Sequence, residues 1–169
     1  LVDNASCDEA KEFLKEWKNG WDTEPGPGEA GYDPILYRPK IQIITNTENL
    51  GTAKAVNKGL KLREPLEYCV KMDNDVVFNK YGWADEMEEV LDRMPTIGIL
   101  GLKRRDLQES VHSINPEQRG RLLEVKHDCG QKWYVVEECK QIMGTCTMLN
   151  HLLLDKVGYF YQMNGLYGF

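Results

Sequence analysis

Two acidic residues, Asp73 and Asp75, interrupt an otherwise apolar stretch of the sequence with one residue between them. The preceding segment, Tyr68–Met72, is predicted to be a buried strand, so both carboxylates come where that strand ends. Carboxylates this close repel each other unless a cation offsets their charge. Mg²⁺ and Mn²⁺ prefer oxygen ligands and keep other positions for water or substrate phosphates. We therefore expect the pair to bind a divalent metal that in turn holds a diphosphate.

The same residues, Asp73–Asp75, also have an ordinary structural interpretation. Asp and Asn side chains accept hydrogen bonds from their own backbone in turns, so an Asp-Asn-Asp sequence is common turn chemistry. A binding role is favoured by position, because ligands of parallel α/β sheets lie beyond the carboxyl ends of the strands. The residues by themselves leave both interpretations open.

Strands and helices alternate along the part of the chain that must position this pair. Strands are predicted at 1–2, 40–45, 68–72 and 96–102, and helices at 7–18, 53–62 and 81–94. This alternation is typical of an α/β domain with a mostly parallel sheet flanked by helices. After Leu102 the pattern changes to a polar segment with loops or a hairpin. Further strands are predicted at 132–138 and 141–150, and a short helix at 151–158.

Polar side chains follow two more of the predicted strands. Asp3 and Asn4 come directly after the first strand, and Asn46–Gly51 follows the second. Since the carboxyl ends of parallel strands meet at one edge of a sheet, three polar blocks are expected side by side there. Any one of them alone would be explained as a turn, but the three together favour a binding cleft.

The composition argues against several classes of protein. A net charge of −6 does not suit a protein that wraps a nucleic-acid backbone by charge, so no nucleic-acid partner is expected. No apolar run reaches the roughly 18 residues that a membrane span requires. The five cysteines are odd in number and show no disulfide spacing, which favours a reducing, cytoplasmic compartment.

Four segments, taken in order, resemble successive blocks of the family-2 type glycosyltransferases, which have the GT-A fold. They read LVDNASCDEAKEFL, NTENLGTAKAVNKGL, YCVKMDNDVVF and GTCTMLNHLLLDKVGYFYQMNGLYGF. The resemblance covers nearly the whole chain except Lys103–Glu138. It implies a single Rossmann-type domain over residues 1–169. The nucleotide-sugar-binding half would be 1–102, and the acceptor-side half, with a smaller mixed sheet, would be 103–169.

The resemblance also implies roles for individual residues. Asp73-Asn74-Asp75 matches the family's DxD motif, with Mn²⁺ or Mg²⁺ as the cofactor and Asp73 and Asp75 as its ligands. Asp75 would bind the metal directly, and Asp73 would lie nearer the ribose and the metal's waters. The residues implied to bind the nucleotide sugar are Asp3, Asn4, Asn49, Gly51, Lys54, Asn57, Asp73 and Asn74. Those implied on the acceptor side are Gly144, Thr145, Cys146 and Tyr167.

The activity implied by the resemblance is transfer of a sugar, with inversion, from a nucleotide-diphosphate sugar to an acceptor hydroxyl. The acceptor would be a saccharide, a lipid-linked glycan or a protein. The family's first strand would lie upstream of Val2, and its catalytic base is expected just after Phe169. The chain is therefore expected to be a fragment of such a domain, with no catalytic base of its own to name.

Two other functions remain open at this point. A sugar-phosphate nucleotidyltransferase has a similar α/β core, and a nucleotide-sugar-binding domain without a base would show the same strand-end residues. A zinc site built from His112, His127, Cys129 and Cys139 is a weaker possibility, because the paired CxxC spacing of strong zinc sites is absent. The aromatic segment Tyr159–Phe169 is a candidate platform for an acceptor sugar.

Overall fold

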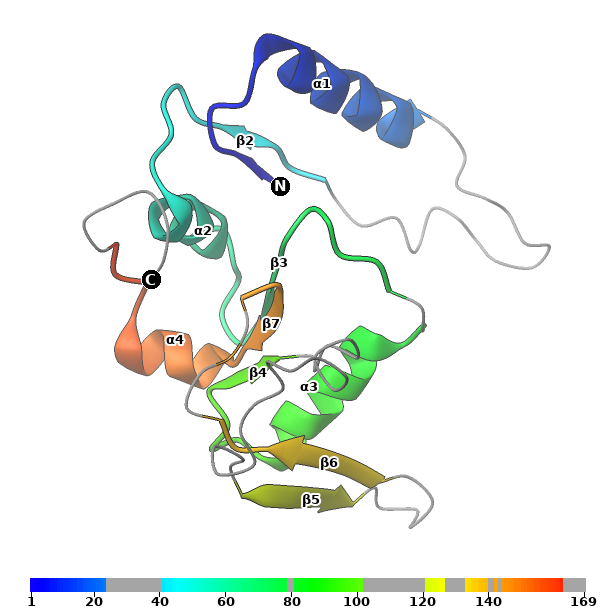
Figure 1. Cartoon of the computed structure of the whole chain (residues 1–169), viewed down its shortest axis with the longest axis vertical. Coiled ribbons are helices and arrows are strands. Elements are labelled where there is room, and N and C mark those ends of the chain that lie inside the picture. The colour runs from blue at the N-terminus through cyan, green and yellow to red at the C-terminus, as the bar shows by residue number, and fades with distance from the viewer. Residues whose placement is uncertain are drawn as a thin grey trace, which may run out of the picture. The chain divides into compact units, whose positions relative to one another are not determined.

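The structure is a computed structural model that describes residues 1–23, 41–78, 81–101, 121–126, 133–139, 142 and 144–162. The chain divides into two compact units (Figure 1). Unit 1 comprises the described residues within Leu1–Leu62 and Tyr159–Phe169, and unit 2 those within Arg63–Gly158. The expected single domain with halves at 1–102 and 103–169 stays a prediction.

Unit 1 is built on a short parallel strand pair with two helices. Its elements are β1 (Val2–Asp3), α1 (Asp8–Thr23), β2 (Ile44–Thr45) and α2 (Thr52–Leu60). Val2 pairs with Ile44 and Asp3 with Thr45, as expected for neighbouring parallel strands. The buried residues of α2 are Ala53, Ala55 and Leu60. The pair β1–β2 thus brings the polar residues that follow each strand to one end of the unit.

Unit 2 holds a three-stranded sheet and a separate hairpin. Its elements are β3 (Cys69–Met72), α3 (Trp83–Arg93), β4 (Ile99–Gly101), β5 (Leu122–Lys126), β6 (Trp133–Glu137), β7 (Cys146–Leu149) and α4 (His151–Val157). The strand order is β3-β7-β4, and β7 runs antiparallel to both neighbours. β5 and β6 pair antiparallel, so the hairpin expected after Leu102 is present.

The prediction of a mostly parallel sheet is not confirmed in the part of the chain that the structure describes. There, β1–β2 is a parallel pair, whereas β7 lies antiparallel between β3 and β4, with Met72 opposite Cys146 and Leu100 opposite Met148. The alternation of strands and helices does not determine between which strands β7 (146–149) lies. It also does not determine whether β7 runs parallel or antiparallel to them. Both depend on long-range pairing, which the apolar pattern of one strand does not encode.

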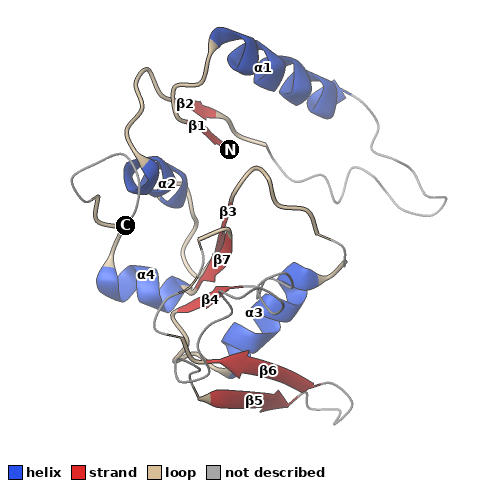
Figure 2. Ribbon diagram, in the orientation of Figure 1, coloured by secondary structure: helices blue, strands red, loops and turns tan. Residues whose placement is uncertain are grey.

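Helix α3 covers the three-stranded sheet of unit 2 through a small apolar core (Figure 2). Met87 and Leu91 of the helix pack with Met148 of β7, and all three are buried. On a neighbouring part of α3, Glu89 Oε2 accepts a hydrogen bond of 2.8 Å from the Tyr134 hydroxyl of β6. One helix therefore anchors both the sheet and the hairpin. None of the helices in the described segments has the length and apolar character that crossing a membrane requires.

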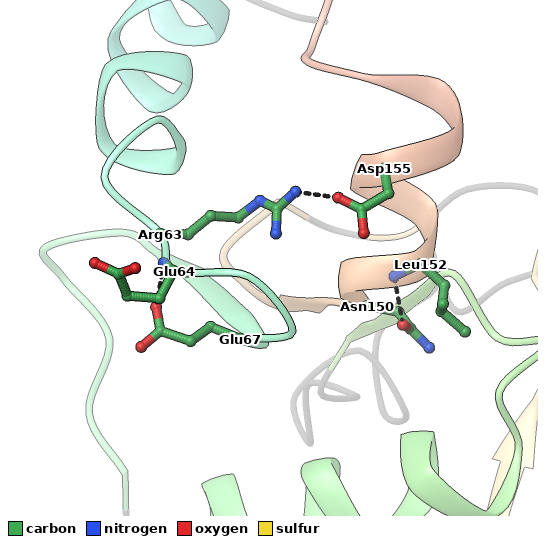
Figure 3. A network of polar contacts seen from close by, with 6 residues as sticks. All are labelled: Arg63, Glu64, Glu67, Asn150, Leu152 and Asp155. Atoms are coloured by element: carbon green, nitrogen blue, oxygen red, sulfur yellow. Dashed lines mark hydrogen bonds and ion pairs between the residues drawn. The ribbon is translucent and has the colours of Figure 1, made fainter.

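Hydrogen bonds and an ion pair hold α4 in place directly after β7 (Figure 3). Asn150 caps the helix, because its Oδ1 accepts from Leu152 N at 2.9 Å, while its Nδ2 donates to Ile97 O at 3.2 Å. Asp155 accepts from the Arg63 guanidinium. The predicted helix end is confirmed as well: Gly158 has φ 84°, a conformation that favours glycine.

Candidate functional site

The two acids of the DxD motif lie just beyond β3, where the sequence placed them. Asp73 N donates to Thr145 O at 2.8 Å, which continues the pairing of β3 with β7 by one more hydrogen bond. Asn74 and Asp75 then form a turn. Both side chains are exposed, and Asp75 has neither a hydrogen bond nor an ion pair with any described residue. The turn and a binding role are therefore compatible, because the turn leaves the Asp75 carboxylate free.

Lys71 supplies the charge that offsets Asp73. Its ammonium group donates to Asp73 Oδ1 and to Gly144 O. The side chain of Lys71 is 12% exposed and that of Asp73 is 44% exposed. Lys71 and Asp73 lie two residues apart, so in a strand both side chains stand on the same face. The repulsion expected between the two acids is thus reduced by a lysine of the same strand.

The acceptor-side residues at the start of β7 lie against this ion pair. Gly144 and Thr145 contact Lys71 and Asp73 through their backbone oxygens, as described above. Cys146 is buried, and burial raises the pKa of its thiol; the positive charge of Lys71 lowers that pKa and the negative charge of Asp73 raises it, both to a smaller extent. Unit 2 therefore brings together Asp73, Gly144, Thr145 and Cys146.

A second group of polar residues follows β1 and β2 in unit 1. Asn4 Oδ1 accepts from Asn46 Nδ2 and from Leu50 N, both at 3.0 Å, and Asn4 Nδ2 donates to Asn49 Oδ1 at 2.8 Å. Asn46 is buried, and its Oδ1 accepts from the Lys58 ammonium of α2. We call these four side chains, Asn4, Asn46, Asn49 and Lys58, the asparagine network. It holds the loop after β2 against the end of β1.

Asp3 stands beside this network with one carboxylate oxygen unused. Oδ1 accepts from Ser6 N at 3.0 Å. Oδ2 is buried and has no hydrogen-bond partner among the described residues, and Asp3 as a whole is 4% exposed. A buried acceptor without a partner costs about 1–3 kcal/mol, and more when it is charged. Asp3 therefore provides an oxygen that a donor N–H group would satisfy.

The remaining nucleotide-side residues surround the start of α2. Gly51 is the N-cap with φ 81°, a backbone conformation that other residues rarely adopt, and its N–H donates to Asn49 Oδ1 at 2.9 Å. Gln162 Oε1 accepts from the N–H groups of Ala53 and Lys54 at 3.0 and 3.3 Å. The side chain of Lys54 is exposed. The first turn of α2 is thus closed by a glutamine from the end of the described chain.

Asn57 holds the same terminal segment. Its Nδ2 donates to Phe160 O at 2.7 Å and its Oδ1 accepts from Phe160 N at 2.9 Å. One turn along the helix, the Lys61 ammonium lies 5.6 Å from the centre of the Tyr159 ring. Asn57 therefore has a structural contact of its own, whatever part it takes in binding a ligand.

The predicted site residues fall into two groups that belong to different units. Unit 1 brings Asp3, Asn4, Asn49, Gly51, Lys54 and Asn57 into one neighbourhood, and unit 2 does so for the DxD and acceptor-side residues. Tyr167 lies outside the described residues. The sequence analysis missed Lys71, Asn46, Lys58 and Gln162. Lys71 alone carried a signal, because a lysine two residues before an acid on a strand shares its face.

The carboxylates can be compared with what a divalent metal requires. Within the described segments, no three His, Cys, Asp or Glu side chains are grouped closely enough to hold a metal by themselves. Mg²⁺ is commonly held by one or two carboxylates together with substrate phosphates and water, so a closed protein cage is not required. The free carboxylate of Asp75 fits that kind of site. Of the suggested zinc ligands, Cys139 is exposed and donates to Glu137 O, and His112, His127 and Cys129 lie outside the described residues.

Comparison with known proteins decides the family. A sequence model described as Glycosyl transferase family 2 matches residues 1–158, which is most of the chain. The chain belongs to glycosyl transferase family 2. The match covers the DxD motif of unit 2 and the asparagine network of unit 1. No match was found among curated proteins or among solved structures.

For this member of glycosyl transferase family 2, the family accounts for the α/β class of the fold and for a glycosyltransferase activity in general. It also implies a nucleotide-sugar donor and an acceptor as partners. Divalent metals are common in the family.

Proposed function

We propose that the chain transfers a sugar from a nucleotide-diphosphate sugar to an acceptor hydroxyl, with inversion, using a divalent metal at Asp75. The observation that carries the proposal is the Asp75 carboxylate just beyond β3, which pairs with none of the described residues, in a chain of glycosyl transferase family 2. The neighbouring acid, Asp73, is already neutralised by Lys71. A single unpaired carboxylate at a strand end is suited to a metal that also binds a diphosphate.

Asp75 would bind Mn²⁺ or Mg²⁺ through its exposed carboxylate. When bound, such a metal supplies Lewis-acid stabilisation of the charge that develops on the leaving diphosphate. Asp73, fixed by Lys71 and by its backbone bond to Thr145, would face the ribose. A carboxylate acting as general base would remove the proton from the acceptor hydroxyl. We assign that base to no described residue.

Asp3 would bind the nucleobase. Its buried Oδ2 has no partner among the described residues, and a ring N–H group of the base would supply the missing donor. Uracil, thymine and guanine carry such a ring N–H, whereas the corresponding nitrogen of cytosine is an acceptor. The proposal therefore favours uridine, thymidine or guanosine diphosphate sugars over cytidine ones.

Donor turnover tests this function. The chain is incubated with UDP-, GDP- and dTDP-sugars and Mn²⁺, with water as the acceptor, and the release of nucleoside diphosphate by hydrolysis is followed by chromatography. We expect release from one class of donor and a loss of at least about tenfold in Asp75→Asn, since that substitution removes the charge that holds the metal. Val77→Ala is the matched control, because Val77 is 90% exposed just after the same turn and is not among the predicted site residues. Release that is equal in the chain and in Asp75→Asn would refute the proposal.

A further inference from the structure

The two acids of the DxD motif differ in their surroundings. Asp73 is paired through Oδ1 with the Lys71 ammonium, whereas Asp75 is exposed and pairs with no described residue. Both belong to the same short segment at the end of β3, yet only one of them has a protein cation. The family resemblance implies different roles for the two acids, and the Lys71 ion pair adds a structural reason for that difference.

The partner of Asp73 is held firmly. The Lys71 side chain is 12% exposed, and its ammonium also donates to Gly144 O. The ammonium group is largely shielded from water, so it is stabilised by the carboxylate beside it, even though Asp73 itself is 44% exposed. Lys71 and Asp73 therefore depend on each other. Asp73 cannot turn toward another cation without leaving the ammonium group uncompensated.

A metal approaching the motif meets unequal ligands. At Asp75 it meets a free negative charge, and at Asp73 it meets an ion pair whose net charge is zero. A metal that bound Asp73 through this oxygen would have to displace the ammonium group from Asp73 Oδ1. The lysine thus competes with any second cation for Asp73.

We propose that Lys71 is a positioning residue that keeps Asp73 out of the metal's coordination, so that Asp75 is the one carboxylate of the motif that binds the metal. The lysine also ties the motif to Gly144, at the start of the acceptor-side strand. The inference rests on the proposed function, because it assumes that a divalent metal binds at the motif.

Two variants separate this proposal from a general structural role. Lys71→Met keeps the length of the side chain and removes its charge, which frees Asp73 to bind the metal together with Asp75. Lys71→Met/Asp73→Asn removes both charges, so the net charge of the pair stays at zero. The double variant leaves neither charge of the pair without its partner, which makes it the safer of the two to fold.

The experiment is a titration followed by the electron paramagnetic resonance signal of free Mn²⁺, with Mn²⁺ alone and again with UDP. Circular dichroism confirms that each variant is folded. We expect Lys71→Met to bind Mn²⁺ about tenfold more tightly than the unchanged chain. Lys71→Arg, which keeps the charge, and the double variant should bind Mn²⁺ within about threefold of the unchanged chain. Asp75→Asn should lose at least about tenfold.

The outcomes distinguish a failure of the role given to Lys71 from a failure of the proposed metal-dependent function. If the double variant loses Mn²⁺ as severely as Asp75→Asn does, Asp73 is a metal ligand and the role given to Lys71 is wrong. Weaker or unchanged Mn²⁺ binding in a folded Lys71→Met variant would overturn it too. If Asp75→Asn binds Mn²⁺ like the unchanged chain, or if the unchanged chain binds none in either titration, the proposed function fails, and the inference fails with it.

Discussion

The side chain of Asn57 pairs with both backbone polar groups of Phe160, its N–H and its C=O. Asn57 Nδ2 donates to Phe160 O at 2.7 Å, and Phe160 N donates to Asn57 Oδ1 at 2.9 Å. An asparagine amide can satisfy a backbone donor and acceptor together, which makes this a specific clamp. It fastens the segment 159–162 to α2 within unit 1, and Gln162 then closes the first turn of that helix.

Asn57→Ala should release this segment. The substitution removes two partly buried hydrogen bonds. We therefore expect a loss of about 1–2 kcal/mol in the free energy of unfolding. The amide hydrogen of Phe160 should exchange with solvent about tenfold faster, measured by hydrogen–deuterium exchange. Lys54→Ala is the control, because the side chain of Lys54 is exposed on the same helix. Unchanged exchange at Phe160 in Asn57→Ala would mean that the clamp does not hold the segment.

Asn4→Ala should loosen the loop after β2. Asn46 is 2% exposed, so loss of the Asn4 oxygen leaves a buried amide group with one hydrogen bond fewer. We expect a cost of about 1–3 kcal/mol in the free energy of unfolding, measured by denaturant titration. Thr47→Ala, at an exposed position of the same loop, should cost less than about 0.5 kcal/mol. Equal effects of the two substitutions would contradict the structural role of the asparagine network.

Tyr68 should make stability depend on pH in the alkaline range. Burial, followed by its 2.6 Å hydrogen bond to Asp92 and the negative charges of Asp92 and Glu88, raises the pKa of the Tyr68 hydroxyl to about 12. Because this pKa is raised above that of an unfolded tyrosine, the stabilisation is complete below about pH 10 and is lost as the pH rises toward about 12. Tyr68→Phe should lower the free energy of unfolding by about 1 kcal/mol near neutral pH.

Comparing the two chains across the alkaline range tests this directly. The difference in unfolding free energy between the unchanged chain and Tyr68→Phe should shrink between about pH 10 and 12. An absorbance titration of the folded protein should also lose a tyrosine that ionises near pH 12 in the variant. A difference that stays constant with pH would show that the Tyr68 hydroxyl is not held protonated by its surroundings.

The described cysteines should divide into reactive and protected thiols. Cys7 and Cys139 are exposed, whereas burial raises the pKa of both Cys69 and Cys146. The thiolate is the reactive form, so iodoacetamide should label the second pair at least about tenfold more slowly in the folded chain at mildly alkaline pH. Peptide mass spectrometry measures each site, and labelling in denaturant serves as the reference. Fast labelling of Cys146 in the folded chain would contradict its place at the start of β7.

The local elements were largely predictable from the sequence because short-range signals determine them. Apolar positions at helical spacing predicted α3, and the structure buries Met87, Val90 and Leu91 as that spacing requires. The helix end at Gly158 and the strand that precedes Asp73 were also located correctly. Each of these signals lies within a few residues of the element that it predicts.

The parts that escaped prediction depend on residues far apart in the chain. The antiparallel insertion of β7 between β3 and β4 requires pairing with residues more than forty positions away, and no single strand encodes it. In the same way, the partner of Asn57 is Phe160, and the acceptor for the first N–H groups of α2 is Gln162. The spacing of Asp73 and Asp75 suggested a metal, and a lysine two residues before Asp73 could share its face, but the contact of Lys71 with Gly144 depends on a residue 73 positions away.

The measurement that tests the central claim most directly is a calorimetric titration of the chain with UDP, GDP, dTDP and CDP. Each nucleotide is titrated with Mn²⁺ and with EDTA, and the series is repeated on Asp75→Asn. The account predicts that a nucleotide with a ring N–H binds in the presence of Mn²⁺, that CDP binds more weakly, and that EDTA or Asp75→Asn weakens binding by at least about tenfold. Nucleotide binding that is indifferent to EDTA and to Asp75→Asn, or no binding to the folded chain, would contradict it.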